Sequence, residues 1–271
     1  MNPYQIPNSS VVKATARAAL RGRWVEAITV SSLGLFGVLI VSLLSSIVLS
    51  SNQQVLMYAA NIMMPIISVF VLAPLFLGII RFFWRLTDSA KDDISSAFYY
   101  FGSRKRYVRA IKLTFIIGWR VATAIILCML PYFVTNILSS SWLYQTLGQD
   151  IPLWAANLIL IESFLYIVGV ICAILYISRY YLVAVVVVMD EELLLLEAVH
   201  ISCMVSKRSS SSFLSLVASL LGWALLTFLL APAIYTLPLM IACYVVHSRF
   251  AMTNYNLVLD YYENNMSGSY R

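Results

Sequence analysis

The chain has 271 residues, of which 61% are hydrophobic and 11% are charged, and its formal net charge is +6. Soluble domains are roughly 45–50% apolar and about 25% charged, because charged side chains must cover their exterior. The composition therefore excludes an ordinary soluble globular protein and predicts an all-α polytopic membrane protein.

The first predicted element is an amphipathic helix over residues 9–23. Lys13, Arg17 and Arg21 repeat at i, i+4 and i+8, so they form one basic stripe along the helix. A basic stripe directly before an apolar run is typical of a helix that lies on a membrane surface. We therefore expect these three side chains to contact anionic lipid headgroups.

Six apolar runs are long enough to cross a hydrocarbon core of about 30 Å, which takes roughly 20 helical residues. Pro232 and Pro238 interrupt the last two runs, so these runs form either a tight hairpin or a re-entrant pair. Six spans with both termini on one side make three hairpins. The predicted spans are approximately 27–49, 55–80, 113–138, 153–177, 213–230 and 235–250.

A second amphipathic helix is predicted over residues 93–101, between the second and third spans. The apolar residues of this segment have the i, i+3, i+4, i+7 spacing of one α-helix face. Aspartates precede the segment and a glycine follows it, as expected at the ends of a helix. The residues of the predicted apolar face are Ile94, Ala97, Phe98 and Phe101.

A third amphipathic helix is predicted over residues 193–207, between the fourth and fifth spans. Each of the three amphipathic helices directly precedes a pair of spans. We therefore expect a single transmembrane domain over residues 1–271, built from three units, each with a cytoplasmic interfacial helix followed by a hairpin.

The distribution of Lys and Arg predicts the orientation of the chain. In a six-span topology every Lys and Arg except Arg120 lies on the side of the N-terminus, and the opposite connections at 50–54 and 139–151 contain neither. Because Lys and Arg gather in cytoplasmic loops, we expect a multi-pass protein of the cell membrane with both termini in the cytoplasm.

The connection between the second and third spans is especially basic. Its basic run directly precedes a span, so we expect it to contact anionic lipid headgroups and not nucleic acid. The residues expected to make these contacts are Arg104, Lys105, Arg106 and Arg109.

Three segments are similar, in order, to the motifs of one family. Residues 13–24 read K-A-T-A-R-A-A-L-R-G-R-W, similar to a K-x-x-A-R-x-x-L-[KR]-G-x-W opening, and residues 74–83 read P-L-F-L-G-I-I-R-F-F, similar to P-L-x-x-G-x-x-R-F-F. Glu197-Ala198 through Gly222-Trp223 is similar to an L-E-A segment that leads into a G-W. On these motifs the chain resembles the bacterial integral-membrane family called domain of unknown function 975.

The resemblance has three departures and a modest implication. Asp190-Glu191-Glu192 stands where the family has a D-N-P-like turn, and Ser209–Ser212 replaces a more basic, Trp-containing stretch. The third span is also unusually basic at its start. The resemblance implies a polytopic bacterial membrane protein whose family has no agreed activity, and it supplies no catalytic residues.

Two ionisable residues, Arg120 and Glu162, lie inside predicted spans, where charges are costly and therefore suggest a function. Counted at 1.5 Å per residue, Arg120 lies about 10 Å from the cytoplasmic surface and Glu162 about 14 Å from the outer surface. In a core of about 30 Å the two depths differ by roughly 5–6 Å, so we predict a contact between them. A structural ion pair, a substrate or proton site, and no contact at all stay open as interpretations.

Enzyme, metal and cofactor signatures are absent from the sequence. There is no H-E-x-x-H, G-x-S-x-G, Walker loop or glycine-rich dinucleotide turn. The carboxylates of Asp190, Glu191 and Glu192 are adjacent and do not converge on one side of a helix, so we expect a solvated turn and no metal site. The cysteines lack C-x-x-C spacing and are expected to be small buried hydrophobes.

The leading functional hypothesis is a non-enzymatic accessory or scaffold protein of the bacterial envelope, in export, envelope maintenance or immunity. It would pack against a membrane protein partner or a second copy, for example through the small-residue spacing of Ser42, Ser46 and Ser50. The alternative is a transporter for a small solute or peptide that uses the Arg120–Glu162 site.

Overall fold

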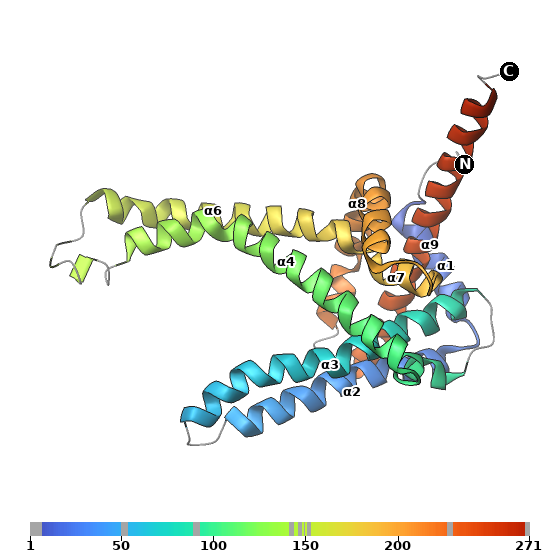
Figure 1. Ribbon diagram of the computed structural model, residues 1–271, viewed down its shortest axis with the longest axis horizontal. Coiled ribbons are helices and arrows are strands. Elements are labelled where there is room, and N and C mark those ends of the chain that lie inside the picture. The colour runs from blue at the N-terminus through green and yellow to red at the C-terminus, as the bar shows by residue number, and fades with distance from the viewer. Residues whose placement is uncertain are drawn as a thin grey trace. The chain divides into compact units, whose positions relative to one another are not determined.

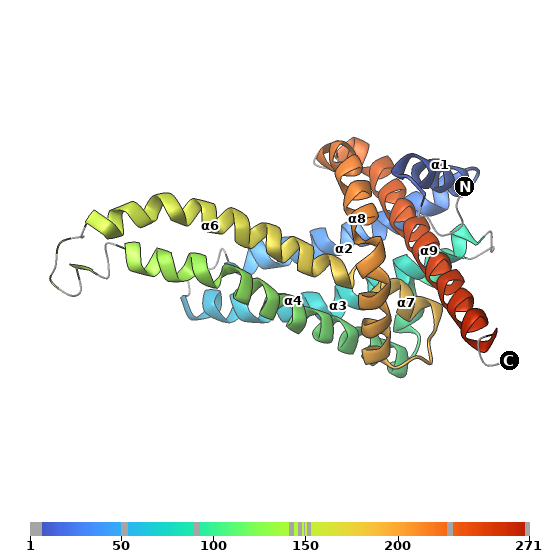
Figure 2. The ribbon, with the colours of Figure 1, turned by 90° about the horizontal axis from the view of Figure 1, so that it is seen from above.

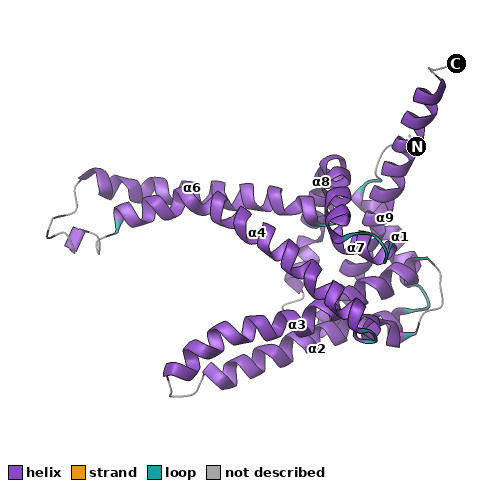
Figure 3. Ribbon diagram, viewed as in Figure 1, coloured by secondary structure: helices purple, strands orange, loops and turns teal. Residues whose placement is uncertain are grey.

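The computed structural model of the protein describes residues 7–49, 54–88, 93–140, 144–145, 148, 150, 153–226 and 230–268. Every element within these residues is helical, as the colours in Figure 3 show. The prediction of an all-α chain is confirmed for this part of the protein.

Five stretches of the described residues are long and apolar enough to cross a membrane. Their mean hydropathy lies between 1.2 and 2.4. They support a multi-pass membrane protein, because a soluble protein could not bury this many apolar helices. The five stretches are Trp24–Leu44, Ile66–Thr87, Arg104–Ser139, Ile161–Met189 and Pro232–Asn256.

The chain divides into two compact units. Unit 1 comprises Met1–Thr114 and Leu182–Arg271, and unit 2 comprises Phe115–Tyr181. One helix, α4 (Arg104–Ser139), begins in unit 1 and continues into unit 2.

Unit 1 is built around α3, which contacts α2, η1, α7 and α9. α1 packs along α9 (Figures 1 and 2), and α8 packs on both α7 and α9. The core includes Leu20, Phe82, Phe83, Leu216 and Val245, all fully or almost fully buried. The helices of this unit, besides the start of α4, are α1 (Ser9–Leu20), α2 (Trp24–Leu49), α3 (Gln54–Thr87), η1 (Ile94–Phe101), α7 (Val183–Met189), α8 (Leu195–Leu226) and α9 (Leu230–Gly268).

The helix α1 starts where the Asn8 side chain accepts a hydrogen bond from the backbone of Ser9 at 2.7 Å, an N-cap that satisfies a free helical N–H. It buries Val12, Ala16 and Leu20 at i, i+4 and i+8, which places one apolar stripe against the core. The chain then turns at Gly22, whose φ of +82° favours glycine.

The segment predicted as an α-helix over 93–101 is instead the 3₁₀ helix η1, capped at its N-terminus by Asp93. A 3₁₀ helix has three residues per turn, so its buried face repeats every three positions. Ala97 and Tyr100 are buried, whereas Phe98 and Phe101 are exposed. The buried pair follows the 3₁₀ period of three, and contact of the exposed Phe98 and Phe101 with lipid stays a prediction.

The helix α8 runs without a break from Leu195 to Leu226. It contains most of the segment predicted as a separate interfacial helix over 193–207, together with the start of the span predicted over 213–230. Residues 227–229 of that predicted span lie outside the described residues. The connection Ser209–Ser212 is helical, and the hydroxyl of Ser209 donates a hydrogen bond to the carbonyl of Val205 at 3.0 Å.

Unit 2 is a hairpin of the second part of α4 with α6 (Leu153–Ile177), followed by the short η2 (Ser178–Tyr180). Figures 1 and 2 both show α4 and α6 side by side. They approach closely at Gly169, where a Cβ atom would lie 2.8 Å from the carbonyl oxygen of Cys128. The rings of Tyr132 and Tyr166 also meet across the hairpin, with centroids 5.3 Å apart.

Candidate functional site

An ion pair between Arg81 of α3 and Glu191 of the α7–α8 turn is the centre of the charged cluster in unit 1. Arg81 is only 8% exposed, and its Nη1 donates a hydrogen bond to Oε1 of Glu191. The hydroxyl of Tyr99 donates to the other carboxylate oxygen at 2.7 Å. Arg106 approaches that same oxygen through Nε at 3.8 Å. Glu191 is thus held by three groups from three elements.

Two guanidinium groups lie over the ring of Tyr99. The Cζ atoms of Arg81 and Arg106 lie 3.4 Å and 3.9 Å from the ring centroid. An aromatic face attracts cations, so this ring helps to keep two like charges close to one another and to Glu191. The arrangement couples α3, η1 and the first turn of α4.

The protonation of Glu191 follows from these contacts. Burial opposes the charged form, but the hydrogen bonds from Tyr99 and Arg81 and the charges of Arg81 and Arg106 outweigh it, so the pKa of Glu191 lies below its usual range. Burial, followed by the hydrogen bond to Glu191, raises the pKa of Tyr99. At neutral pH the carboxylate is therefore charged and the phenol is a donor.

Local sequence places each of these groups. Gly78 lets η1 approach α3, since a Cβ there would lie 1.8 Å from the carbonyl oxygen of Ala97. Arg81 follows Gly78 by three residues and so lies on the same face of α3. The turn that carries Glu191 is closed by Asp190, whose side chain accepts from the backbone N–H groups of Glu192 and Leu193 at 2.9 Å and 3.2 Å.

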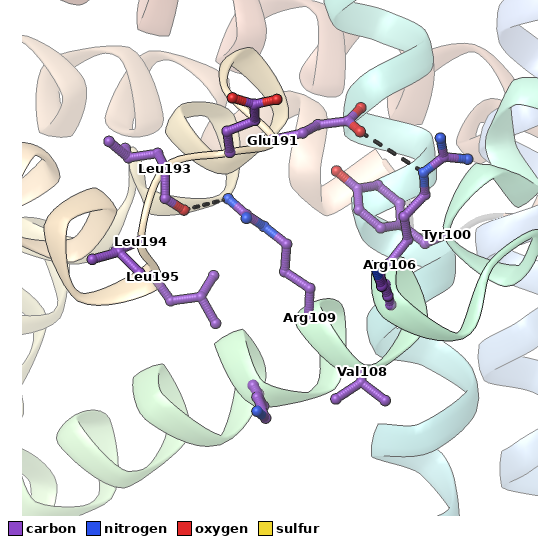
Figure 4. A pocket seen from close by; sticks show the side chains of 11 residues that line it. Tyr100, Arg106, Val108, Arg109, Glu191, Leu193, Leu194 and Leu195 are labelled. Carbon is purple, nitrogen blue, oxygen red and sulfur yellow. Dashed lines mark hydrogen bonds and ion pairs between the residues drawn. The ribbon is translucent and has the colours of Figure 1, made fainter.

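Beside this cluster lies a pocket of about 400 Å³, which we call the α4 pocket (Figure 4). One wall is the basic first part of α4, another is the α7–α8 turn with three leucines, and η1 contributes one tyrosine. Four cationic side chains face two carboxylates, so the formal charge of the lining is +2. Its residues are Tyr100, Lys105, Arg106, Val108, Arg109, Lys112, Glu191, Glu192, Leu193, Leu194 and Leu195.

Arg109 spans the α4 pocket, and Figure 4 shows its side chain reaching toward Leu193. Its Nη2 donates to the carbonyl oxygens of Asp190 at 3.1 Å and of Leu193 at 2.7 Å. These bonds fix the guanidinium plane, because two carbonyls hold one nitrogen. Its Nε is buried without a hydrogen-bond partner in the part of the chain that the structure describes.

Tyr100 contributes a buried hydroxyl to the α4 pocket. The residue is 1% exposed, and its hydroxyl has no hydrogen-bond partner among the described residues. Burial raises the pKa of Tyr100 to about 12, so the hydroxyl keeps its proton over the physiological range. In Figure 4 the hydroxyl end of the ring points toward the space between Arg109 and Glu191.

Comparison of the chain with protein-family models, curated proteins and solved structures gave no match. The function must therefore be argued from the geometry alone. A pocket with excess positive charge, a protonated hydroxyl and an apolar wall is suited to bind an anion. Among the described residues, no group of three or more His, Cys, Asp or Glu is placed to hold a metal ion.

The predicted contact between Arg120 and Glu162 is wrong. The carboxylate of Glu162 instead accepts from Asn136 Nδ2 through one oxygen, and the Ser139 hydroxyl lies 3.4 Å from the other. Asn136 follows Arg120 on the same helix by about 24 Å, at 1.5 Å per residue. The prediction failed because it assumed that both spans begin at the surfaces of a hydrocarbon core about 30 Å thick and placed Arg120 and Glu162 by their depth in that core. α4 is longer than such a core is thick, since Asn136 lies about 35 Å from the predicted start of the span at 113.

Glu162 lies in a second pocket, on the surface of unit 2. This pocket has a volume of about 460 Å³ and is lined by Tyr132, Glu162, Ser163, Tyr166 and Ile167. We call it the hairpin pocket. It combines one carboxylate, three hydroxyl groups and an aliphatic side chain on a hairpin that is otherwise strongly apolar.

The residues predicted to contact lipid headgroups have different surroundings. Lys13 donates to the backbone carbonyl of Ser219 at 2.9 Å and is partly buried, whereas Arg17 and Arg21 are exposed. On α4, Arg104 and Lys105 are exposed; Arg106 and Arg109 engage the α7–α8 turn. Contact with lipid stays a prediction for all of them.

Sequence reasoning missed several members of the α4 pocket and its cluster, among them Tyr100, Arg81 and Glu191. Tyr100 was overlooked because the α-helical period excluded it from the buried face of η1. Arg81 stands in the sequence analysis only as the arginine of the 74–83 motif, and Glu191 is predicted there as part of a solvated turn. A 3₁₀ period of three residues would have found Tyr100, but the pairing of residues 81 and 191 leaves no mark in a single sequence.

Proposed function

We propose that the protein is a non-enzymatic accessory or scaffold protein of the bacterial envelope that holds another membrane protein through the α4–α6 hairpin. The observation that carries the proposal is the hairpin pocket, a polar and aromatic surface on an apolar two-helix unit. Export, envelope maintenance and immunity to a membrane-active peptide are the settings that suit such a role. In this proposal the hairpin crosses the cell membrane and both termini lie in the cytoplasm.

The hairpin covers little of its own apolar surface. In Arg104–Ser139 only 11% of the apolar window is buried. Lipid tails or another protein must cover the remainder, because water cannot. Large side chains that face outward on the two helices include Phe115, Trp119, Leu127, Phe133, Phe164 and Ile171.

The hairpin pocket favours a protein as part of that cover. Asn136 and Ser139 use only part of the acceptor capacity of the Glu162 carboxylate. Lipid tails offer no further donor to it and no acceptor for Ser163, whereas a helix with polar side chains offers both. Polar groups in an apolar environment are stabilised only when they are hydrogen-bonded. We therefore assign the pocket to a partner helix that carries a donor such as Asn, Gln, Ser or Lys.

Site-specific photocrosslinking in native membranes tests this function. A benzophenone amino acid replaces Ile167, which lines the pocket and is 56% exposed. The matched control replaces Leu175, which lies two turns further along α6, is 51% exposed and does not line the pocket. We expect a protein adduct of one defined mass from position 167 and only lipid adducts from position 175. Lipid adducts alone from both positions would reject the proposal.

The transporter alternative predicts a different response to Glu162→Gln. A scaffold should lose crosslinking several-fold, since the amide offers one neutral acceptor in place of a charged carboxylate. A transporter that uses Glu162 should lose flux into proteoliposomes and should not depend on a partner. Undiminished crosslinking together with lost flux would transfer the assignment to transport.

A further inference from the structure

We propose that the α4 pocket binds a phosphate group, with the headgroup of an anionic lipid as its source. The pocket lies at the charged end of α4, where the dense run of basic residues at 104–112 gives way to the apolar part of the helix. This inference is independent of the role proposed for the α4–α6 hairpin. It rests on the charge of the lining, on two unpartnered donors and on an apolar wall.

The positive charge of the pocket is available to a ligand. Glu191 is held by Arg81, Tyr99 and Arg106, so among the four cations of α4 it offsets mainly the charge of Arg106. Lys105 and Lys112 are exposed on α4 and line the pocket. Four cations on one wall attract an anion with more than one charge, and phosphate is the anion that Arg and Lys recognise best together.

Arg109 is preorganised for an anion. Two backbone carbonyls of the α7–α8 turn hold its Nη2 and so orient the guanidinium. Its buried Nε has no partner among the described residues and remains available as a donor. A guanidinium that is fixed before binding loses less conformational entropy when it binds a phosphate oxygen.

Tyr100 supplies the second unpartnered donor. A buried hydroxyl without a hydrogen bond is rare and costs free energy, so its position requires an explanation. A phosphate oxygen between Tyr100 and Arg109 would accept from both. The 3₁₀ geometry of η1 turns Tyr100 inward, which makes the donor a consequence of local backbone structure.

The apolar wall selects the source of the phosphate. Leu193, Leu194 and Leu195 line the wall that faces α4, Val108 adds an apolar side chain on α4 itself, and Leu194 is 66% exposed. An exposed leucine between two half-buried ones, next to a cationic site, matches a molecule with a phosphate at one end and hydrocarbon at the other. A free phosphate ion would contact only the cationic side chains of the pocket and leave its leucines without a partner.

The experiment is a native mass-spectrometry titration of the full-length protein in detergent with phosphatidic acid and, separately, with phosphatidylcholine. We expect selective binding of one phosphatidic acid molecule. Tyr100→Phe and Arg109→Gln should each weaken it by roughly ten-fold, as loss of a charge-assisted hydrogen bond does. The matched control is Arg208→Gln, which removes an exposed arginine of α8 outside the pocket and should leave the affinity unchanged.

A second arm identifies the source of the phosphate. Inorganic phosphate is titrated into the same protein, and its competition with bound phosphatidic acid is measured. Competition only at concentrations far above those of the lipid supports the lipid headgroup. Equal affinity for inorganic phosphate supports the phosphate site and overturns the lipid as its source.

We expect Tyr100→Phe to fold normally, because it removes one oxygen that has no hydrogen-bond partner in the described structure. Its thermal midpoint is measured in the same detergent. An unchanged midpoint with unchanged affinity for both phosphatidic acid and inorganic phosphate would overturn the proposal. The same holds if Arg208→Gln weakens binding as much as Arg109→Gln, because the attraction would then be general surface charge.

Discussion

Gly78 of α3 lies so close to Ala97 of η1 that a Cβ atom on Gly78 would be 1.8 Å from the Ala97 carbonyl oxygen. This contact brings η1 onto α3 and places Tyr99 over Arg81. The charged cluster and the α4 pocket therefore depend on glycine at position 78, because any side chain there would clash with η1.

Gly78→Ala should displace η1 and destabilise the protein by about 2 kcal/mol or more, because backbone must move to admit the methyl group. Thermal unfolding in detergent, followed by tryptophan fluorescence, measures the effect. Gly222→Ala in α8 is the matched control, since no atom beyond the backbone of its own helical turns lies within 4 Å of its Cβ position among the described residues. It should leave the midpoint unchanged or raise it, as alanine favours helix. Equal midpoints for both variants would contradict the contact.

Glu191→Gln should destabilise unit 1 by roughly 1–3 kcal/mol, because Arg81 is then buried without its counter-charge. The pKa of Glu191 is lowered in the folded protein. The stabilisation is therefore complete above the ordinary glutamate pKa of about 4.3 and is lost as the pH falls through the lower folded pKa. Midpoints measured over acidic pH should fall more steeply for the wild type than for Glu191→Gln, and parallel curves would refute the pairing.

Neighbouring tyrosines should respond oppositely to loss of their hydroxyl groups. Tyr99→Phe removes a 2.7 Å hydrogen bond to Glu191 and should cost about 1–2 kcal/mol. Tyr100→Phe removes a hydroxyl without a partner in the described structure and should leave the stability unchanged or raise it. Urea or thermal unfolding of the two variants side by side checks this. The reverse order would show that Tyr100 has a partner in the unliganded protein.

Lys13 and Arg17 should differ, although they belong to one basic stripe. Lys13→Gln removes the hydrogen bond to the Ser219 carbonyl and should cost about 1 kcal/mol. Arg17→Gln changes an exposed residue and should leave the thermal midpoint unaltered. Binding to vesicles with anionic lipid measures the predicted contact with lipid headgroups, and Arg17→Gln should weaken this binding. If Lys13→Gln weakens vesicle binding more than Arg17→Gln at unchanged stability, the inward placement of Lys13 is incorrect.

Glu192→Gln should strengthen binding of phosphatidic acid by roughly two- to five-fold, since it removes an exposed negative charge from the rim of the α4 pocket. High salt should shrink this gain, because exposed charges are screened. The titration described for Tyr100→Phe measures both effects. A fall in affinity would place Glu192 among the binding groups and not among the repelling ones.

Composition and hydrophobic periodicity were sufficient to predict the broad architecture. The apolar runs predicted a helical, multi-pass chain, and the described residues contain five helices that are long and apolar enough to cross a membrane. The bounds predicted for the run at 153–177 coincide with those of α6. Such features are local, because hydropathy and helix period depend on neighbours within a few turns.

Everything about the candidate site that involves distant residues required the tertiary structure. Glu191 forms an ion pair with Arg81, which lies 110 positions away in the chain. Glu162 accepts a hydrogen bond from Asn136 and does not contact Arg120, the partner that we expected. Charge and approximate depth made Arg120 and Glu162 look like partners, but only the register of two packed helices decides which side chains meet. The sequence by itself determined which segments are helical and apolar. Packing decided which charges are neutralised and which donors, such as the Tyr100 hydroxyl, have no partner among the described residues, because both depend on contacts that a one-dimensional pattern does not contain.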